Sequence, residues 1–332
     1  MRRLIFDTAN VLFRVAAAHG KYSSGTPEEK AGLAMHVSLN VFLKYFRMFQ
    51  PDQIALTFEG VNNWRKEYTK SAACVSKRVY KANRVKDPAM EPYFALMKSF
   101  ERLVREHTSL VCLSAPEVEG DDLFAGYVQR FTEEGDEVIG ISGDKDFVQL
   151  LKHPKFRLIN PDDGKDRVCA DPLLFMFEKC MRGDAGDNVM SAYPRVRKTR
   201  LEKAYNDEYE LIQLMQEQWQ GPHPTDPEQT LTFKVQDLFI ENILLMDLEA
   251  QPAHIRDIIR TTLDYELANH GKFSLFHFQK FLGKYDLRQI SDNVMQYVDM
   301  FSVTDLRSPH RKVEQSPIVG PTTSSAEAAI IF

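Results

Sequence analysis

Acidic side chains recur along the chain in short clusters, and they are the residues best suited to chemistry. The candidates are nine carboxylates from five segments: Asp7, Glu59, Glu119, Asp121, Asp122, Asp144, Asp146, Asp184 and Asp187. Oxygen ligands without histidine or cysteine favour hard cations, Mg²⁺ or Mn²⁺. Two such ions about 4 Å apart are a standard device for in-line displacement at a phosphodiester.

Each acid taken alone also has an ordinary structural explanation. An aspartate at a helix start, such as Asp121 or Asp184, is commonly an N-cap or a favourable charge on the helix dipole. Asp7 and Glu59 fit acids in loops that follow strands, and the Asp144/Asp146 pair fits a solvated turn. The joint arrangement favours metal binding, because so many gathered acids repel one another unless cations compensate.

The elements that must position these acids are strands alternating with helices. Apolar runs predict strands at 4–6, 54–58, 110–113, 138–141 and 156–159, and helical periodicity covers 35–49, 90–107 and 119–134. This alternation predicts an α/β fold with a mostly parallel central sheet flanked by helices. Parallel sheets bind ligands at the carboxyl ends of their strands, which is where the acids fall.

The second half of the chain reads as mainly α-helical. Candidate helices are 172–181, 200–219, 235–246, 252–268 and 273–282, and three prolines within 221–228 indicate a loop. The tail from about residue 306 is rich in Ser, Pro, Thr and Ala and is expected to be disordered. Its apolar end, 326–332, fits either a short peptide for a partner's groove or an incidental apolar terminus.

Composition excludes several classes of protein. The chain has 332 residues, of which 43% are hydrophobic, so it can bury a core and is not intrinsically disordered. No apolar run is long enough for a membrane span, and the N-terminus does not read as a signal peptide. The four cysteines form no CxxC pair, which argues against a zinc site and favours a reducing, cytoplasmic location.

Net charge is a misleading statistic for this chain. The overall value of −5 argues against a nucleic-acid partner, but setting the nine acids aside leaves +4. Residues 61–86 hold eight basic side chains against the single acid Glu67, with Trp64, Tyr68 and Tyr80 interleaved. Such a segment fits a solvated helix face or a channel with stacking platforms for a single nucleic-acid strand.

Six motifs together resemble the 5′-nuclease family of flap endonucleases and 5′–3′ exonucleases, above all its bacteriophage ribonuclease H and flap exonuclease members. They begin at Asp7, Phe58, Tyr80, Glu119, Ser142 and Gly183, and they run Asp-Thr-Ala-Asn, Phe-Glu-Gly, Tyr-Lys-Ala-Asn-Arg, Glu-Gly-Asp-Asp, Ser-Gly-Asp-Lys-Asp and Gly-Asp-Ala-Gly-Asp-Asn. The resemblance covers roughly residues 1–300. It implies a PIN-like nuclease core that uses two Mg²⁺ ions, for which Mn²⁺ can substitute.

The resemblance also implies roles for the acids. The first metal would be held by Asp7, Glu59, Glu119, Asp121 and Asp144, and the second by Asp146, Asp184 and Asp187, with Asp122 or Asp144 near both. The first ion would activate a water, and the second would stabilise the leaving 3′ oxygen. The family usually has Asp where this chain has Glu59.

By the same resemblance, residues 61–90 would form a helical arch beside the 5′ single strand. Lys81 and Arg84 would share a helix face and contact the scissile phosphate. The family's helix–hairpin–helix carries a glycine-rich turn, whereas residues 189–198 hold no glycine, so basic side chains are expected to contact the duplex instead. The expected DNA-binding residues are Arg65, Lys77, Arg78, Tyr80, Lys86, Arg195, Arg197, Lys198 and Arg200.

The expected organisation is a nuclease core at 1–180, a helical C-terminal domain at 181–305 and a tail at 306–332. The expected partners are DNA with a 5′ flap, or an RNA–DNA hybrid, met during DNA replication by a monomer. A sliding clamp or single-strand-binding protein would engage the C-terminal region. If the chain is phage-encoded, the location would be the host cytoplasm. A PIN-like ribonuclease, a Toprim-type enzyme and a non-catalytic binder of branched DNA are the alternatives.

Overall fold

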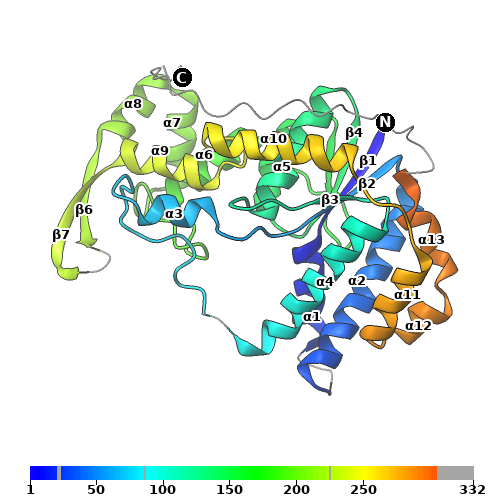
Figure 1. Cartoon of the computed structure of the whole chain (residues 1–332). Coiled ribbons are helices and arrows are strands. Elements are labelled where there is room, and N and C mark those ends of the chain that lie inside the picture. The colour runs from blue at the N-terminus through cyan, green and yellow to red at the C-terminus, as the bar shows by residue number, and fades with distance from the viewer. Residues whose placement is uncertain (21–23, 86, 224–225, 305–332) are drawn as a thin grey trace, which may run out of the picture.

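A five-stranded parallel sheet forms the centre of this computed structural model, which describes residues 1–20, 24–85, 87–223 and 226–304 (Figure 1). The strand order is β3-β2-β1-β4-β5, and all neighbouring strands are parallel. The strands are β1 (Arg2–Asp7), β2 (Gln53–Thr57), β3 (Val111–Leu113), β4 (Glu137–Ile141) and β5 (Phe156–Ile159). The predicted α/β class and the five predicted strands are confirmed.

Both faces of the sheet are buried, because successive side chains of each strand point to opposite faces. On β1, Leu4 and Phe6 enter one apolar core, while Ile5 enters the other. The first face is covered by α1 (Thr8–Gly20), α2 (Pro27–Phe49) and α4 (Glu91–His107), and the second by α5 (Gly120–Glu133) and the 3₁₀ helix η2 (Asp146–Lys152).

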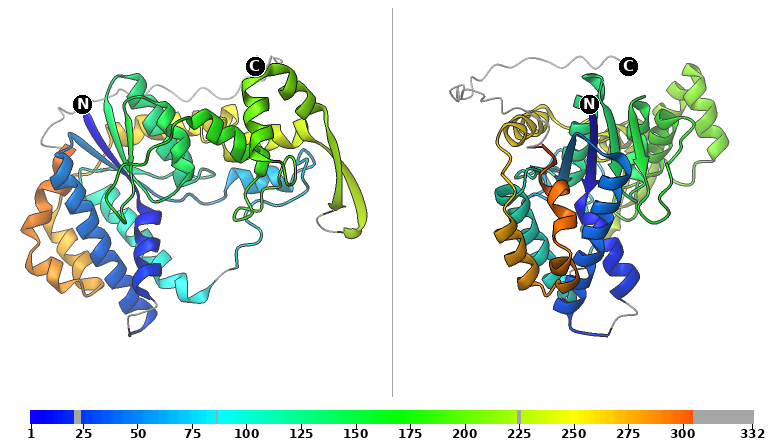
Figure 2. Two further views of the ribbon diagram at one scale, coloured as in Figure 1. Left: turned by 180° about the vertical axis from the view of Figure 1, so that it is seen from behind. Right: turned by 90° about the vertical axis from the view of Figure 1, so that its right-hand side faces the viewer.

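The C-terminal helices return to the sheet rather than forming a separate domain. Helix α10 (Ala253–Ala268) packs with α5, and α11 (Leu275–Lys284), α12 (Arg288–Asp292) and α13 (Met295–Phe301) share the core of α2 and α4. Figure 2 shows these last helices in orange beside α2 in blue. The apolar cores therefore do not divide at the predicted boundary, residue 180.

A smaller helical region lies beside the second face and has its own apolar clusters. It contains α6 (Pro172–Arg182), α7 (Lys198–Asn206), α8 (Glu208–Gln216) and α9 (Val235–Met246). Two expectations fail here. The helix expected at 200–219 is interrupted at Asp207, which lies between α7 and α8 and caps α8 with its side chain. The expected loop at 221–228 lies in an antiparallel hairpin of β6 (Gln218–His223) and β7 (Asp226–Lys234), which projects from the molecule.

The segment expected to be a helical arch is mostly not helical. Among the described residues of 61–90, helix is confined to α3 (Trp64–Lys70) and the single 3₁₀ turn η1 (Pro88–Met90). The carboxylate of Glu241 on α9 accepts hydrogen bonds from the backbone amides of Val75 and Ser76. Residues 61–76 therefore lie against the helical region, and the predicted helical arch is wrong for this structure.

No helix among the described residues is long and apolar enough to cross a membrane. The predicted tail at 306–332, including the expected partner peptide at 326–332, lies outside the described residues.

Candidate active site

The acids gather at the carboxyl edge of the sheet. Asp7, which is 6% exposed, ends β1, and its carboxylate accepts hydrogen bonds from the Ser142 hydroxyl (2.8 Å) and the Asn10 amide (3.0 Å). The Asn10 side chain accepts in turn from the Gly143 amide at 2.9 Å. The loop after β4 is thereby tied to the end of β1, and Ser142 orients Asp7 from the neighbouring strand.

Two more groups of acids follow the adjacent strands. In the loop after β4, the amide of Asp146 donates to the Asp144 carboxylate at 2.8 Å and opens η2. Next to β2, Glu59 accepts from the Gly120 amide at 3.4 Å, so it meets the start of α5. Asp121 lies half-buried on the first turn of α5. The predicted convergence of β1, β2, β4 and α5 on one edge is therefore present.

The acids at this edge carry more negative charge than the neighbouring basic side chains balance. Burial, together with the charges of Asp144 and Glu59, raises the pKa of Asp7 to about 7. Burial and Asp7 raise the pKa of Asp121 well above its ordinary value. Glu59 is solvent-accessible, yet the surrounding protein and Glu119 raise its pKa as well. Three carboxyls from separate elements thus favour a bound proton or another cation at this edge.

The last two acids come from the loop after α6. Gly183 ends that helix at φ +68, and an added Cβ would lie 2.6 Å from the Val189 carbonyl oxygen. The Asp184 carboxylate accepts from the amides of Gly186 and Asp187, at 2.8 and 3.3 Å. This tight turn presents the carboxylates of Asp184 and Asp187 toward the sheet edge.

Residues 79–84 are paired with the same loop. The Lys81 amide donates to the Asp187 carbonyl oxygen at 2.8 Å. The side chains of Asn83 and Asn188 each donate to a backbone carbonyl of the other segment, at 2.8 and 2.9 Å. The Tyr80 and Gly183 motifs, which are distant in sequence, therefore form one surface.

Three cations neutralise part of the cluster. Lys81 pairs with Glu119 and lies 3.9 Å from Asp187, and Arg84 donates to Asp187 at 2.6 Å. Burial alone would raise the pKa of Asp187, but Lys81, Tyr80 and Arg84 hold it below its ordinary value. Lys179 pairs with Asp146. Burial still raises the pKa of Asp146, although Lys179 opposes the shift.

A small cavity of about 20 Å³ lies within the acid cluster. Its lining includes Glu119, Asp121, Asp146, Asp184, Asp187 and the cation Lys179. This volume has room for about one water or one ion. Within the described part of the chain, no group of three or more acidic, histidine or cysteine side chains lies close enough together to coordinate a metal ion as it stands. The donor set still fits Mg²⁺ or Mn²⁺, because it consists of carboxylates alone.

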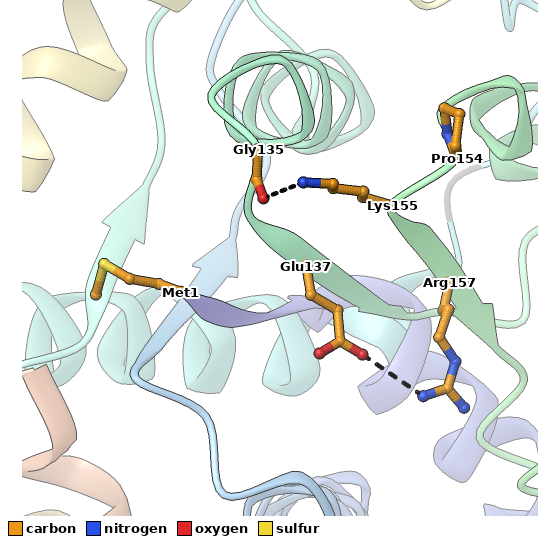
Figure 3. Close-up of a pocket in the computed structure, with 6 residues that line it drawn as sticks. All are labelled: Met1, Gly135, Glu137, Pro154, Lys155 and Arg157. Carbon is orange, nitrogen blue, oxygen red and sulfur yellow. Dashed lines mark hydrogen bonds and ion pairs between the residues drawn. The ribbon is translucent and has the colours of Figure 1, made fainter.

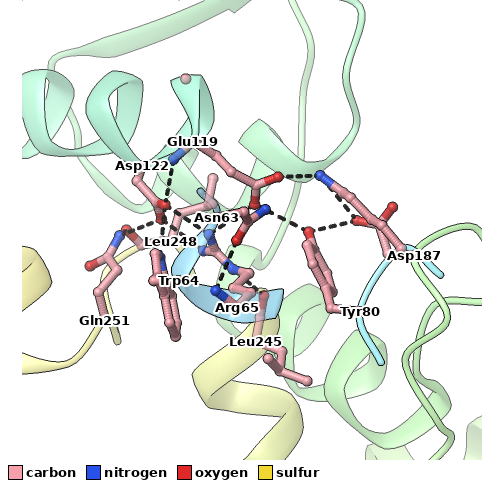
Figure 4. Close-up of polar contacts among 12 residues, drawn as sticks. Asn63, Trp64, Arg65, Tyr80, Glu119, Asp122, Asp187, Leu245, Leu248 and Gln251 are labelled. Atoms are coloured by element: carbon pink, nitrogen blue, oxygen red, sulfur yellow. Dashed lines mark hydrogen bonds and ion pairs between the residues drawn. The ribbon is translucent and has the colours of Figure 1, made fainter. Parts of the chain in front are cut away.

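Asp122 differs from the other acids, because it is turned into the interior. It is 0% exposed, and its two carboxylate oxygens accept from Arg65 at 2.7 Å each. Trp64 Nε1 and Gln251 Nε2 donate to it at 3.1 and 3.0 Å (Figure 4). Burial alone would raise the pKa of Asp122, but Arg65 lowers it below its ordinary value. The prediction that Asp122 ligates a metal is wrong for this structure.

Two expected DNA contacts are also buried. Arg65 is 1% exposed and donates to Glu119 (3.0 Å) and the Leu245 carbonyl (2.8 Å) as well as to Asp122. Tyr80 is 5% exposed, and its hydroxyl donates to Asp187 (2.9 Å) and Glu119 (3.3 Å). In this structure neither side chain is therefore placed to contact DNA. Both join the segment 61–84 to the acids (Figure 4).

Lys81 and Arg84 do not share a helix face as predicted. Residues 80–83 form a turn in which Lys81 takes φ +55, and the Arg84 amide donates to the Lys81 carbonyl at 3.3 Å. Both side chains nevertheless reach Asp187. Lys77 is exposed and Arg78 half-buried, while Lys86 lies outside the described residues. Contacts of Lys77, Arg78 and Lys86 with DNA stay predictions.

The turn that lacks glycine is built with a left-handed arginine. Residues 193–196 turn before α7, and Arg195 adopts φ +59, a conformation that glycine adopts at less cost. Arg195, Arg197 and Lys198 are exposed, whereas Arg200 pairs with Glu217. The chain thus makes the turn without glycine, and DNA contacts by Arg195, Arg197, Lys198 and Arg200 stay predictions.

The sequence did not single out Lys179 or Gln251. Lys179 lies one helical turn before Gly183, so its nearness to Asp184 follows from the sequence. Its contact with Asp146 depends on the packing of α6 against η2. No motif in the sequence points to Gln251, because folding alone brings this residue to Asp122, which is distant in sequence.

A larger surface depression, of about 440 Å³, lies at the opposite edge of the sheet, where β4 and β5 begin. Its two cations are already engaged: Lys155 donates to the Gly135 carbonyl, and Arg157 pairs with Asp166 and Glu137 (Figure 3). The depression contains none of the predicted site residues.

The half of the chain that carries most of these acids matches a known protein family. Residues 2–175 match the family described as the 5′–3′ exonuclease, N-terminal resolvase-like domain. Ribonuclease H of Enterobacteria phage T4 is 24% identical over 274 residues, which cover 77% of this chain and 86% of that protein. The thermostable DNA polymerase I of Thermus filiformis is 32% identical over 117 residues, 33% of this chain but only 14% of the polymerase.

Solved structures of bacteriophage T5 proteins share the fold. A complex of the T5 flap endonuclease with DNA and metal ions gives a TM-score of 0.54 at 16% identity, covering 80% of this chain and 98% of that one. The T5 5′-exonuclease with bound zinc gives 0.53 at 17% identity, covering 80% and 100%. At such identities the likeness concerns the fold alone.

Proposed function

Because the chain belongs to the 5′–3′ exonuclease family, we propose that it is a structure-specific 5′-nuclease that cuts DNA near the junction of single strand and duplex. Family membership makes it a nuclease; its substrate, its cations and the acting residues are the proposal. The observation that carries it is the convergence of carboxylates from β1, β2, β4, α5 and the loop after α6 beside Lys81 and Arg84.

Eight acids would hold two divalent cations. Asp7, Glu59, Glu119, Asp121 and Asp144 form the first set, and Asp146, Asp184 and Asp187 form the second. The raised pKa values of four acids support this assignment, because they show that a bound cation would stabilise the ionised carboxylates. These acids are Asp7, Glu59, Asp121 and Asp146. When bound, Mg²⁺ or Mn²⁺ would provide a water of lowered pKa and stabilise the leaving oxygen.

The residues of the chain perform the other tasks. Ser142 holds one oxygen of Asp7, and Arg65 holds one oxygen of Glu119, so both carboxylates are oriented before a substrate arrives. Lys81 and Arg84 now pair with Glu119 and Asp187. We propose that they turn to the scissile phosphate once cations occupy the acids, and there they would stabilise the charge that develops on the non-bridging oxygens.

The substrates to test come from the named relatives, one a flap endonuclease solved with DNA and one a ribonuclease H. A 5′-flap duplex and an RNA–DNA hybrid are incubated with the full chain, with Mg²⁺ or with EDTA, and product lengths are read on a gel. Cleavage near the junction or from the 5′ end, only with the divalent ion, is expected. Equal cleavage in EDTA, or none on either substrate, would refute the proposal.

Non-catalytic binding of branched DNA is separated by the same gel. A binder would shift the flap duplex in a native gel and leave its length unchanged in every divalent ion. A role in removing RNA primers during replication would appear as cleavage of the hybrid strand from its 5′ end.

A further inference from the structure

Lys179 on α6 lies at the second set of acids. Its side chain is 13% exposed, and its ammonium group is fully buried. Nζ contacts the Asp146 carboxylate and lies 3.6 Å from an oxygen of Asp184. Electrostatic attraction to these two carboxylates holds the ammonium group in place, because Nζ makes no hydrogen bond of regular geometry within the described part of the chain.

The same ammonium group lines the 20 Å³ cavity together with Asp121, Asp146, Asp184 and Asp187. The cavity has room for about one ion. An ion placed there would lie close to the ammonium, and two positive charges a few ångströms apart in a partly buried place repel strongly. The ammonium group and a divalent ion would therefore bind to the same two carboxylates, those of Asp146 and Asp184.

From this geometry we infer that Lys179 competes with a divalent cation for Asp146 and Asp184 and so weakens metal binding at the second set of acids. The inference rests on the proposed function and assigns Lys179 a role in setting the cation affinity of that site. Without metal, the ammonium keeps the two carboxylates together. When the nucleic-acid phosphates bring further negative charge to the site, the balance shifts toward the metal.

The test compares Lys179→Met with Lys179→Arg, which keeps the charge, and with Lys280→Met, which removes an exposed lysine on α11. Mn²⁺ is titrated into each full-length protein without DNA, and free Mn²⁺ is read by electron paramagnetic resonance. We expect Lys179→Met to bind Mn²⁺ at its weaker site about tenfold more tightly. Lys179→Arg and Lys280→Met should match the wild type.

Stability without metal gives a second readout of opposite sign. In EDTA, Lys179→Met should melt at a lower temperature than the wild type, because Asp146 and Asp184 lose their counter-charge. Saturating Mn²⁺ should remove this difference in melting temperature. If Lys179→Met does not fold, Lys179→Gln keeps a polar side chain without the charge and takes its place in both measurements.

Unchanged or weaker Mn²⁺ binding in the uncharged variants would overturn the inference. A wild type that binds Mn²⁺ at two sites, with the same affinities in Lys179→Met, would contradict only the role of Lys179. Absence of Mn²⁺ binding from the wild type and all variants would overturn the proposed metal-dependent function along with it.

Discussion

Replacing Arg65 with methionine would test the buried network that joins residues 61–84 to the acids. Methionine fills a similar space but leaves the Asp122 carboxylate, 0% exposed, with three neutral donors: Trp64 at 3.1 Å, Gln251 at 3.0 Å and the Glu119 amide at 3.3 Å. Glu119 also loses its charged donor on one oxygen, which keeps the longer contact from the Tyr80 hydroxyl. The variant therefore leaves a buried charge without its counter-charge.

The cost can be bounded from the carboxyl group itself. Asp122 can escape its charge by taking up a proton, and doing so at pH 7 from the ordinary pKa of 3.8 costs about 4 kcal/mol, at about 1.4 kcal/mol per pH unit. This agrees with the roughly 3–5 kcal/mol lost when one partner of a buried ion pair is removed. At about 2 °C per kcal/mol, the melting temperature should fall by about 6–10 °C.

Urea and thermal unfolding in EDTA would measure this loss for Arg65→Met, Asp122→Leu and the double variant. The double variant should be less destabilised than Arg65→Met, because no unpaired charge remains on Asp122. The loss in Arg65→Met should shrink toward pH 5, because protonation of Asp122 then costs less. A loss below about 1 kcal/mol, together with a lower salt slope of DNA binding, would refute the reasoning and make Arg65 a DNA contact.

Three further predictions concern the site and its supports. Lys81→Met should lower the single-turnover cleavage rate at least about 100-fold with little change in DNA affinity; a change in affinity alone would oppose its proposed role. In EDTA the melting temperature should rise as the pH falls from 8 to 5.5, because the folded pKa of Asp7, about 7, exceeds its ordinary 3.8, so the folded state binds protons more strongly. Saturating Mg²⁺ or Asp7→Asn should reduce this rise, and an unchanged rise in Asp7→Asn would contradict the assignment. Gly183→Ala should cost about 1–3 kcal/mol in urea unfolding, because its φ is +68 and the new Cβ meets the Val189 carbonyl; wild-type stability would contradict the required left-handed turn.

The parts of the fold that follow from local pattern could be predicted from the sequence. The apolar runs ending at Asp7 and Ile141 specify buried parallel strands, and parallel strands bring their carboxyl ends to one edge. The acids after those strands were therefore expected to converge. The side-chain contacts that orient them, such as Ser142 on Asp7, required the register of β1 against β4.

The parts that failed depend on packing. Basic residues look alike in sequence, so nothing distinguishes buried Arg65 from exposed Lys77 until α3 is packed against α5 and α9. Asp121 and Asp122 are neighbours, yet helical geometry turns one toward the acids and the other toward Arg65. The β6–β7 hairpin was not predicted, because its prolines indicated a loop. Proline is tolerated there because both strands of a two-stranded hairpin are edge strands.

The central claim is that the acids at the carboxyl edge of the sheet carry out cation-dependent cleavage of nucleic acid. The most direct measurement is the single-turnover cleavage of one 5′-flap duplex by the wild type and by Asp144→Asn in Mg²⁺, with binding of the same duplex measured in Ca²⁺. We predict that Asp144→Asn binds the duplex within a few-fold of the wild type but does not cut it. Wild-type cleavage by Asp144→Asn would contradict the account.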